Sequence, residues 1–147
     1  MSIKTTEEEF RQYVAHCKWW MVRLSLGQYT YMFTVEASSY DASVVTTDEL
    51  LASVYLAQER EGEMTIPFLA RHEMLEVLVD DSFKELYKTH NDEYIQAKRH
   101  NLIHRLEKIL SLPTDKEVGF VGKKKSKKAK PIEVVKKKKE KLCQSEK

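Results

Sequence analysis

The alternation of hydrophobic and polar positions predicts one helix, then short strands, then two more helices. Thr6 and Glu9 have the spacing of a capping box, which opens a helix of roughly three turns with its apolar residues on one side. Residues 19–26 shift toward strand preference, residues 29–35 are β-branched and aromatic, and residues 42–45 form a short apolar stretch. We therefore expect strands over these three stretches.

The segment between residues 46 and 59 has two interpretations. Thr46 or Thr47, followed by two acids, is a plausible helix cap. The sequence Ala-Ser-Val-Tyr-Leu at residues 52–56 suits a short buried strand equally well, and local signals leave both open.

The second half of the chain predicts two amphipathic helices. Pro67 lies in the first turn of a helix over about residues 65–79, and Asn91 or Asp92 opens a long helix that ends near residue 110. Strands early and helices late predict an α+β fold, with a small, mostly antiparallel sheet of three to four strands.

Charge divides the chain more sharply than its net charge of +2 indicates. Residues 1–111 carry a net charge of −6, and residues 112–147 carry +8. Because dense like charges repel and little apolar material lies among them, we expect a folded domain at 1–111 and a disordered Lys-rich tail at 112–147. The lysines between Lys123 and Lys141 are either a handle for nucleic acid or another acidic partner, or a solubility tail without a specific partner.

Composition narrows the class of protein. The chain has 147 residues, 41% of them hydrophobic, with four glycines and three prolines, which excludes collagen-like and wholly disordered chains. No apolar run approaches the roughly 20 residues of a membrane span, and the first residues lack a signal-peptide core. Cys17 and Cys143 form no disulfide framework. We expect a soluble cytoplasmic protein with no membrane partner.

Candidate chemistry lies on the helix near residue 70. Leu75 and Val79 mark its predicted buried face, with His72 about 40° and Glu76 about 80° from that direction. His72 and Glu76 are four residues apart, one helical turn, which lets both side chains grip one ion. Glu73 lies roughly 100° from His72, at the edge of the same site.

The last helix carries a polar stripe of its own. Its apolar positions are Ile95, Leu102, Leu106, Ile109 and Leu110. Glu93, His100 and Glu107 recur every seven residues, with His104 close by. That stripe lies about 120–160° from Ile95, so periodicity favours solvent for it. His100 completes a site on the preceding helix only if the two helices pack on that side.

Spacing alone leaves the chemistry open. A His-Glu pair on a helix is often only an ion pair at the edge of an amphipathic stripe. The pattern His-Glu-x-x-Glu is not the standard zinc signature, which has His at the fifth position. Carboxylates do bind zinc, however, and a site with two histidines and one carboxylate is chemically ordinary.

The order of these features resembles the small zincin-like metallopeptidases found in bacteriophage genomes. The matching pieces, in chain order, are Trp20-Met21-Val22, residues 42–45, residues 52–56, the motif helix at 70–78, and residues 99–107 with Ile103 and Arg105-Leu106-Glu107. The resemblance spans about residues 18–110 and excludes the Lys-rich tail. It implies that residues 52–56 form a strand at an edge above the motif helix, where in zincins an extended peptide substrate adds as a further strand.

The resemblance also implies a role for each site residue. His72 would be the first Zn²⁺ ligand, and Glu73 the catalytic general base. Glu76 stands in the place of the second histidine ligand. His100 would be the third ligand, with Glu107 as an alternative ligand or as a hydrogen-bond partner that orients a ligand.

Three functional hypotheses follow. The first is a zinc-dependent hydrolase of peptide or protein substrates in the cytoplasm, the host cytoplasm if a phage encodes it. The second is a catalytically inactive zincin-like binding or structural module, because Glu76 in place of histidine makes a zinc-bound water a weaker acid. The third is a nucleic-acid accessory protein that acts through the basic tail.

Overall fold

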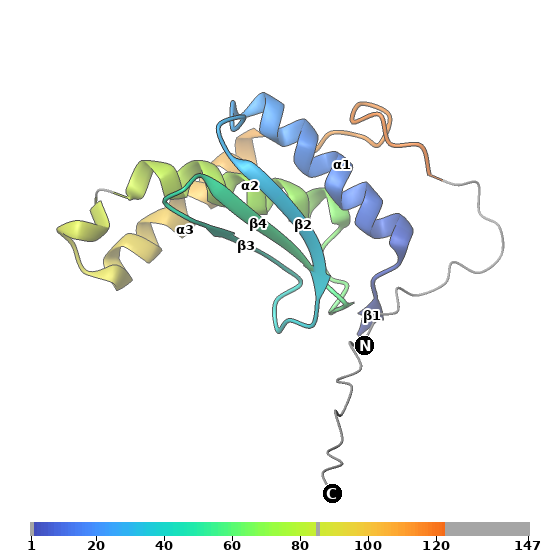
Figure 1. Cartoon of the computed structure of the whole chain (residues 1–147), viewed down its shortest axis with the longest axis horizontal. Coiled ribbons are helices and arrows are strands. Elements are labelled where there is room, and N and C mark those ends of the chain that lie inside the picture. The colour runs from blue at the N-terminus through green and yellow to red at the C-terminus, as the bar shows by residue number, and fades with distance from the viewer. Residues whose placement is uncertain (1, 85, 123–147) are drawn as a thin grey trace, which may run out of the picture.

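The computed structural model describes residues 2–84 and 86–122 (Figure 1). The predicted α+β class is confirmed, with three α-helices and two small sheets in the described part of the chain. The elements are β1 (Ile3–Lys4), α1 (Glu7–Arg23), β2 (Thr30–Glu36), β3 (Ala42–Thr46), β4 (Leu51–Ala57), β5 (Glu59–Arg60), α2 (Ile66–Phe83), the 3₁₀ helix η1 (Leu86–Lys88) and α3 (Asp92–Ile109). Within this part, no helix is long and apolar enough to cross a membrane.

The capping box predicted at the start of α1 is confirmed. The backbone N–H of Glu9 donates to Thr6 Oγ1 over 3.2 Å, and the backbone N–H of Thr6 donates to Glu9 Oε2 over 2.8 Å. The other carboxylate oxygen of Glu9 lies 2.7 Å from the Arg60 guanidinium, so the same residue also connects α1 to β5. The two short strands β1 and β5 pair antiparallel beside this contact.

α1 is longer than the sequence predicts. The expectation of a strand over residues 19–26 is wrong, since the helix continues to Arg23. Tyr13, Cys17 and Trp20 are all buried, and their spacing places them along one face of a continuous helix. Burial of that face outweighs the modest strand preference of the aromatic residues, because strand propensity depends strongly on context.

The main sheet has the order β2-β4-β3 and is mixed, whereas the sequence predicts a mostly antiparallel sheet. β4 pairs parallel with β2, placing Val54 opposite Phe33, and antiparallel with β3, placing Val54 opposite Val44. Residues 52–56 therefore form a strand, as the resemblance implies. Their expected place at the sheet edge is wrong, however, because β4 pairs on both sides. The edge strand that contacts α2 is β3.

α2 is the central helix of the fold. It contacts α1, α3 and β3, and Figure 1 shows it running behind the sheet beside α3. The predicted apolar face of Leu75 and Val79 is buried, but Ala70, Met74 and Val77 on other sides are buried as well. A helix surrounded in this way has no single solvent face, so its polar residues are enclosed by neighbouring elements.

α3 begins at the predicted cap, where the Glu93 backbone N–H donates to the Asn91 side chain over 2.7 Å. Its packing face is centred differently from the prediction: Ile95 and Ile103 are buried, whereas Ile109 is 76% exposed. Because Ile103 lies about 80° from Ile95, the face turns toward Glu107. This rotation brings Glu107, which the periodicity predicts to face solvent, to the interface between α3 and α2.

Residues 112–122, which we call the C-terminal strap, pack along α1 (orange in Figure 1). The Asp115 carboxylate accepts a hydrogen bond from Gln12 over 2.8 Å and lies 2.8 Å from Nε2 of the buried His16. Pro113 is also buried. The folded domain therefore extends beyond the predicted boundary at residue 111. The two lysine blocks, and the disorder expected for them, fall at residues 123–147, outside the described residues.

Candidate functional site

His72 and Glu76 lie one turn apart on α2, as their spacing predicts. Nε2 of His72 is 3.6 Å from Oε1 of Glu76, and each side chain is 24% exposed. Both are positioned by the buried residues around them on α2, which fix the rotation of this helix between α1 and α3. The site is therefore partly shielded from water but accessible.

Glu107 of α3 holds the other nitrogen of the His72 ring. Its Oε1 lies 2.7 Å from His72 Nδ1, and its Oε2 lies 3.1 Å from Nδ1 of His104. The Glu107 side chain is 8% exposed, so the expectation from periodicity that this residue faces solvent is wrong. The cause is the rotated packing face of α3. One carboxylate thus orients two imidazoles through their Nδ1 atoms.

Arg71 fixes the distance between the two helices at this level. Its guanidinium Nη1 donates to the backbone carbonyl of Glu107 over 3.0 Å and to that of Leu110 over 2.6 Å. These carbonyls belong to the last turn of α3, where four carbonyls lack partners within the helix. Arg71 therefore satisfies the end of α3 and holds the Glu107 side chain opposite His72.

Arg99 occupies the corresponding position beside Glu76. Its Nη2 lies 3.9 Å from Glu76 Oε2 and 3.4 Å from Asp80 Oδ1. Asp80 in turn accepts a hydrogen bond from the Thr46 hydroxyl at the end of β3. This chain of contacts connects α3, α2 and the edge strand, and it places one positive charge next to Glu76.

His100 does not join His72 and Glu76. It is exposed, and its Nδ1 lies 3.1 Å from the Gln96 carbonyl of its own helix. At the level of Glu76, α3 presents Arg99 to α2, and the next residue is rotated by about 100° from that direction. The arrangement therefore does not support the role of third ligand that the resemblance implies for His100.

Glu73 is the most buried acid of the group, at 4% exposure. Burial raises the pKa of its carboxyl group to about 8, with the charge of His72 lowering that pKa and the charge of Glu76 raising it. At pH 7 the side chain is therefore mostly protonated, and its titration midpoint lies about one pH unit higher. Such a group can both accept and return a proton.

His72 and Glu76 shift each other's pKa in opposite directions: the pKa of His72 rises, and that of Glu76 falls. The Glu76 carboxylate, 3.6 Å away, raises the pKa of His72 to about 9; burial opposes this shift, and Glu107 adds to it. The ion pair with His72 likewise holds the pKa of Glu76 below its ordinary value. Without a metal ion, His72 is thus a protonated imidazolium between two carboxylates.

Glu76 lines a separate hollow with Asp80 and Arg99, whereas a cleft of about 340 Å³ opens beside His72 and Glu73. His72, Glu73 and His104 line it, together with the loop before β3 and the loop before α2. The two loops contribute three acids, Asp41, Glu61 and Glu63. Sequence spacing assigns no role to His104. The sequence does contain one indication that His104 belongs to this group. It lies three residues before Glu107, which places both side chains on one side of α3.

The pair His72 and Glu76 fits a zinc ion in part. Two ligand atoms about 2.0–2.2 Å from a tetrahedral zinc are roughly 3.3–3.5 Å apart, close to the 3.6 Å between Nε2 and Oε1. Glu107 on Nδ1 is the usual outer partner of a zinc-binding histidine. Among residues 2–84 and 86–122, however, no group of three or more His, Cys, Asp or Glu side chains is arranged around one metal position. Water would have to complete the coordination.

Comparison of the chain with models of protein families, with curated proteins and with solved structures found no match. The interpretation of this site consequently rests on its own geometry and on the resemblance of the sequence motifs.

Proposed function

We propose that the cleft is the active site of a zincin-like, zinc-dependent hydrolase of peptide or amide bonds. The observation that carries this proposal is the arrangement around His72, with Nε2 facing Glu76 across 3.6 Å and Nδ1 held by Glu107 at 2.7 Å. His72 and Glu76 would hold the ion, which supplies a Lewis acid and acidifies water. Glu107 holds the ring of His72 so that Nε2 faces Glu76, and the two would share the ion.

Glu73 is the proposed general base. It lies next to His72 in the sequence, lines the same cleft and has a carboxyl pKa of about 8. Its carboxylate form takes the proton from the attacking water, and the resulting acid returns that proton to the leaving amine. The neighbouring strand β3 lies at an edge of the sheet and pairs with no second strand among the described residues, so an extended peptide can lie along it.

The experiment that tests this proposal is hydrolysis of a mixture of quenched fluorogenic peptides, with zinc added, by the parent protein and Glu73→Gln. We expect activity that a chelator abolishes, and a loss of at least a hundredfold in Glu73→Gln at unchanged zinc content. A matched control is Glu49→Gln, an exposed acid, which should keep full activity. No hydrolysis by a folded, zinc-loaded parent would contradict the proposal.

A second candidate function is an inactive zincin-like binding or structural module. It is favoured by the Arg99 guanidinium near Glu76 and by the mutual neutralisation of His72 with two carboxylates, which stabilise the site without any metal. An inactive module of this kind would have a stable fold and show no hydrolysis.

The nucleic-acid function through Lys123 to Lys141 stays a prediction from sequence, since those lysines lie outside the described residues. A cytoplasmic location, in the host cell if a phage encodes the chain, belongs to the same proposal.

A further inference from the structure

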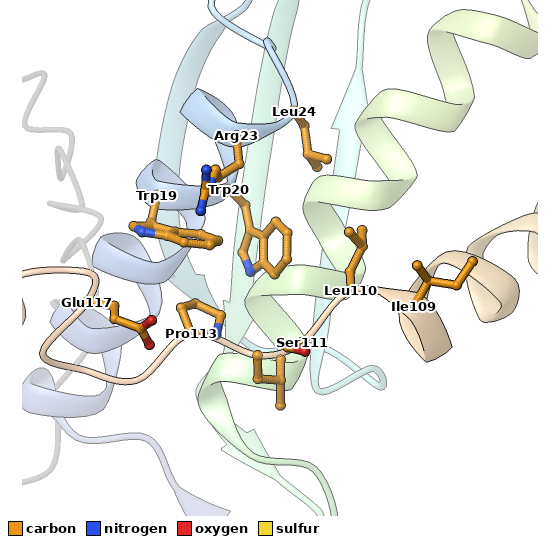
Figure 2. Close-up of a pocket in the computed structure, with 10 residues that line it drawn as sticks. Trp19, Trp20, Arg23, Leu24, Ile109, Leu110, Ser111, Pro113 and Glu117 are labelled. Atoms are coloured by element: carbon orange, nitrogen blue, oxygen red, sulfur yellow. The ribbon is translucent and has the colours of Figure 1, made fainter.

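A second cavity lies away from the cleft, between the end of α1 and the segment that joins α3 to the C-terminal strap (Figure 2). Its volume is about 440 Å³, within the range of roughly 300–1,000 Å³ that small-molecule sites occupy. Its walls are largely apolar, formed by Trp19, Trp20 and Leu24 on one side and by Leu110 and Pro113 on the other.

The wall of this cavity contains a polar group without a partner. Trp20 is only 3% exposed, and its indole Nε1 makes no hydrogen bond to any described residue. Figure 2 shows the nitrogen edge of the ring facing the segment around Ser111 and Pro113, which forms the opposite wall. A buried N–H without an acceptor costs about 1–3 kcal/mol, so a ligand that supplies an acceptor there would recover this energy.

The positively charged side chain of Arg23 lies at the rim of the same cavity. The guanidinium of Arg23 stacks over the Trp19 ring, 5.0 Å from its centroid, and makes no hydrogen bond or ion pair with a described residue. The other charged group, Glu117, accepts through Oε2 from the backbone N–H of Thr114 over 2.7 Å and from its hydroxyl over 2.8 Å, and the charge of Arg23 contributes to lowering its pKa. Two donors of the cavity therefore lack an acceptor among the described residues, the Arg23 guanidinium and the Trp20 indole N–H.

We propose that this cavity binds a small carboxylate with an apolar body, such as a medium-chain fatty acid. The apolar body fills the space between Trp20, Leu110 and Pro113. The carboxylate receives hydrogen bonds from the planar guanidinium of Arg23, whose geometry suits a carboxylate, and from the indole N–H of Trp20. Nothing in this proposal depends on metal binding or hydrolysis in the cleft.

The sequence supplies a selective probe, because Trp19 and Trp20 are the chain's two tryptophans and both line this cavity. Titration of the full chain with octanoate, with excitation of tryptophan alone, should produce a saturable change in emission. Octanamide has a similar length but no charge, and it should bind at least tenfold more weakly. Arg23→Gln should weaken octanoate binding about tenfold and leave octanamide binding unchanged.

Two further variants complete the test. Arg11→Gln removes an exposed cation of α1 that lies outside this cavity, and it should bind octanoate like the parent. Ser111→Phe narrows the cavity from an exposed position and should weaken both ligands. The proposal is overturned if octanoate causes no saturable change in a folded parent, or if octanamide or the Arg23→Gln variant binds as tightly as the parent binds octanoate.

Discussion

Glu107 Oε1 lies 2.7 Å from His72 Nδ1, across a sequence separation of 35 residues. This contact joins the last turn of α3 to the middle of α2 and leaves Nε2 of His72 facing Glu76. In a zinc site the same contact would fix the tautomer and the orientation of the ligand. Without zinc it is an ion pair between an imidazolium and a largely buried carboxylate. Both states therefore depend on Glu107.

Substitution Glu107→Gln should lower the pKa of His72 and destabilise the metal-free protein at pH 6. A partly buried charged hydrogen bond contributes about 1–3 kcal/mol, so we expect a loss of that order in urea unfolding. The imidazole pKa, followed by NMR, should fall from about 9 toward its ordinary value. Glu93→Gln, at an exposed position of the same helix, is the control. An unchanged His72 titration in Glu107→Gln would contradict the assigned contact.

Glu73→Gln should stabilise the protein above neutral pH. The folded pKa of about 8 is higher than the ordinary value of 4.5, so the folded state retains a proton that the unfolded state releases. Stability is consequently lost as pH rises from about 4.5 through 8. Glutamine removes this loss, and we expect a gain of up to about 5 kcal/mol at pH 8.5, because each pKa unit corresponds to 1.36 kcal/mol. Thermal unfolding of the parent and Glu73→Gln at pH 5 and pH 8.5 measures this gain. If the two proteins differ in stability by the same amount at both pH values, the carboxyl group of Glu73 does not have a raised pKa.

Zinc affinity should fall steeply as pH decreases. A proton on His72 competes with the ion, and the pKa of that imidazole is about 9 in the metal-free protein. Below this value the apparent affinity should weaken by about tenfold per pH unit. The same raised pKa implies that the His72 ion pairs stabilise the metal-free fold below pH 6.5 and are lost as pH rises through 9. Competition with a chromophoric chelator between pH 6 and 8 tests the slope; a pH-independent affinity would exclude His72 as a ligand.

The C-terminal strap should contribute to the stability of the domain. A chain that ends at residue 111 loses the contacts of Asp115 with Gln12 and His16 and exposes the surface beneath Pro113. We expect it to be less stable by about 1–3 kcal/mol in urea unfolding. The matched control is a chain that ends at residue 122, which keeps the strap and removes the lysine blocks. Equal stability of the two truncated chains would show that the strap contributes nothing.

Local features of the sequence predict much of this fold. The capping signals at Thr6 and Asn91 mark the starts of two helices, because a cap is decided by residues within one turn. The continuation of α1 through Trp20 is not predictable in this way. It depends on burial of one helix face against α2, which overrides the strand preference of neighbouring residues.

The residues of the candidate site also fall into those that local sequence predicts and those that depend on tertiary packing. His72, Glu73 and Glu76 are predictable because they lie within one turn of a single helix. The place of Glu107 depends on how α3 rotates against α2, which Ile103 and Arg71 determine through tertiary contacts. For the same reason the spacing that drew attention to His100 does not bring it to the site.

The central claim is that His72 and Glu76 bind one zinc ion. The most direct measurement is the zinc content, by plasma mass spectrometry, of protein purified without affinity-tag metal and dialysed against dilute zinc. We predict near-stoichiometric zinc in the parent and in Glu36→Gln, whose changed residue is exposed at the end of β2, and none in Glu76→Gln. A folded parent without zinc, or a Glu76→Gln variant that retains it, would contradict the account.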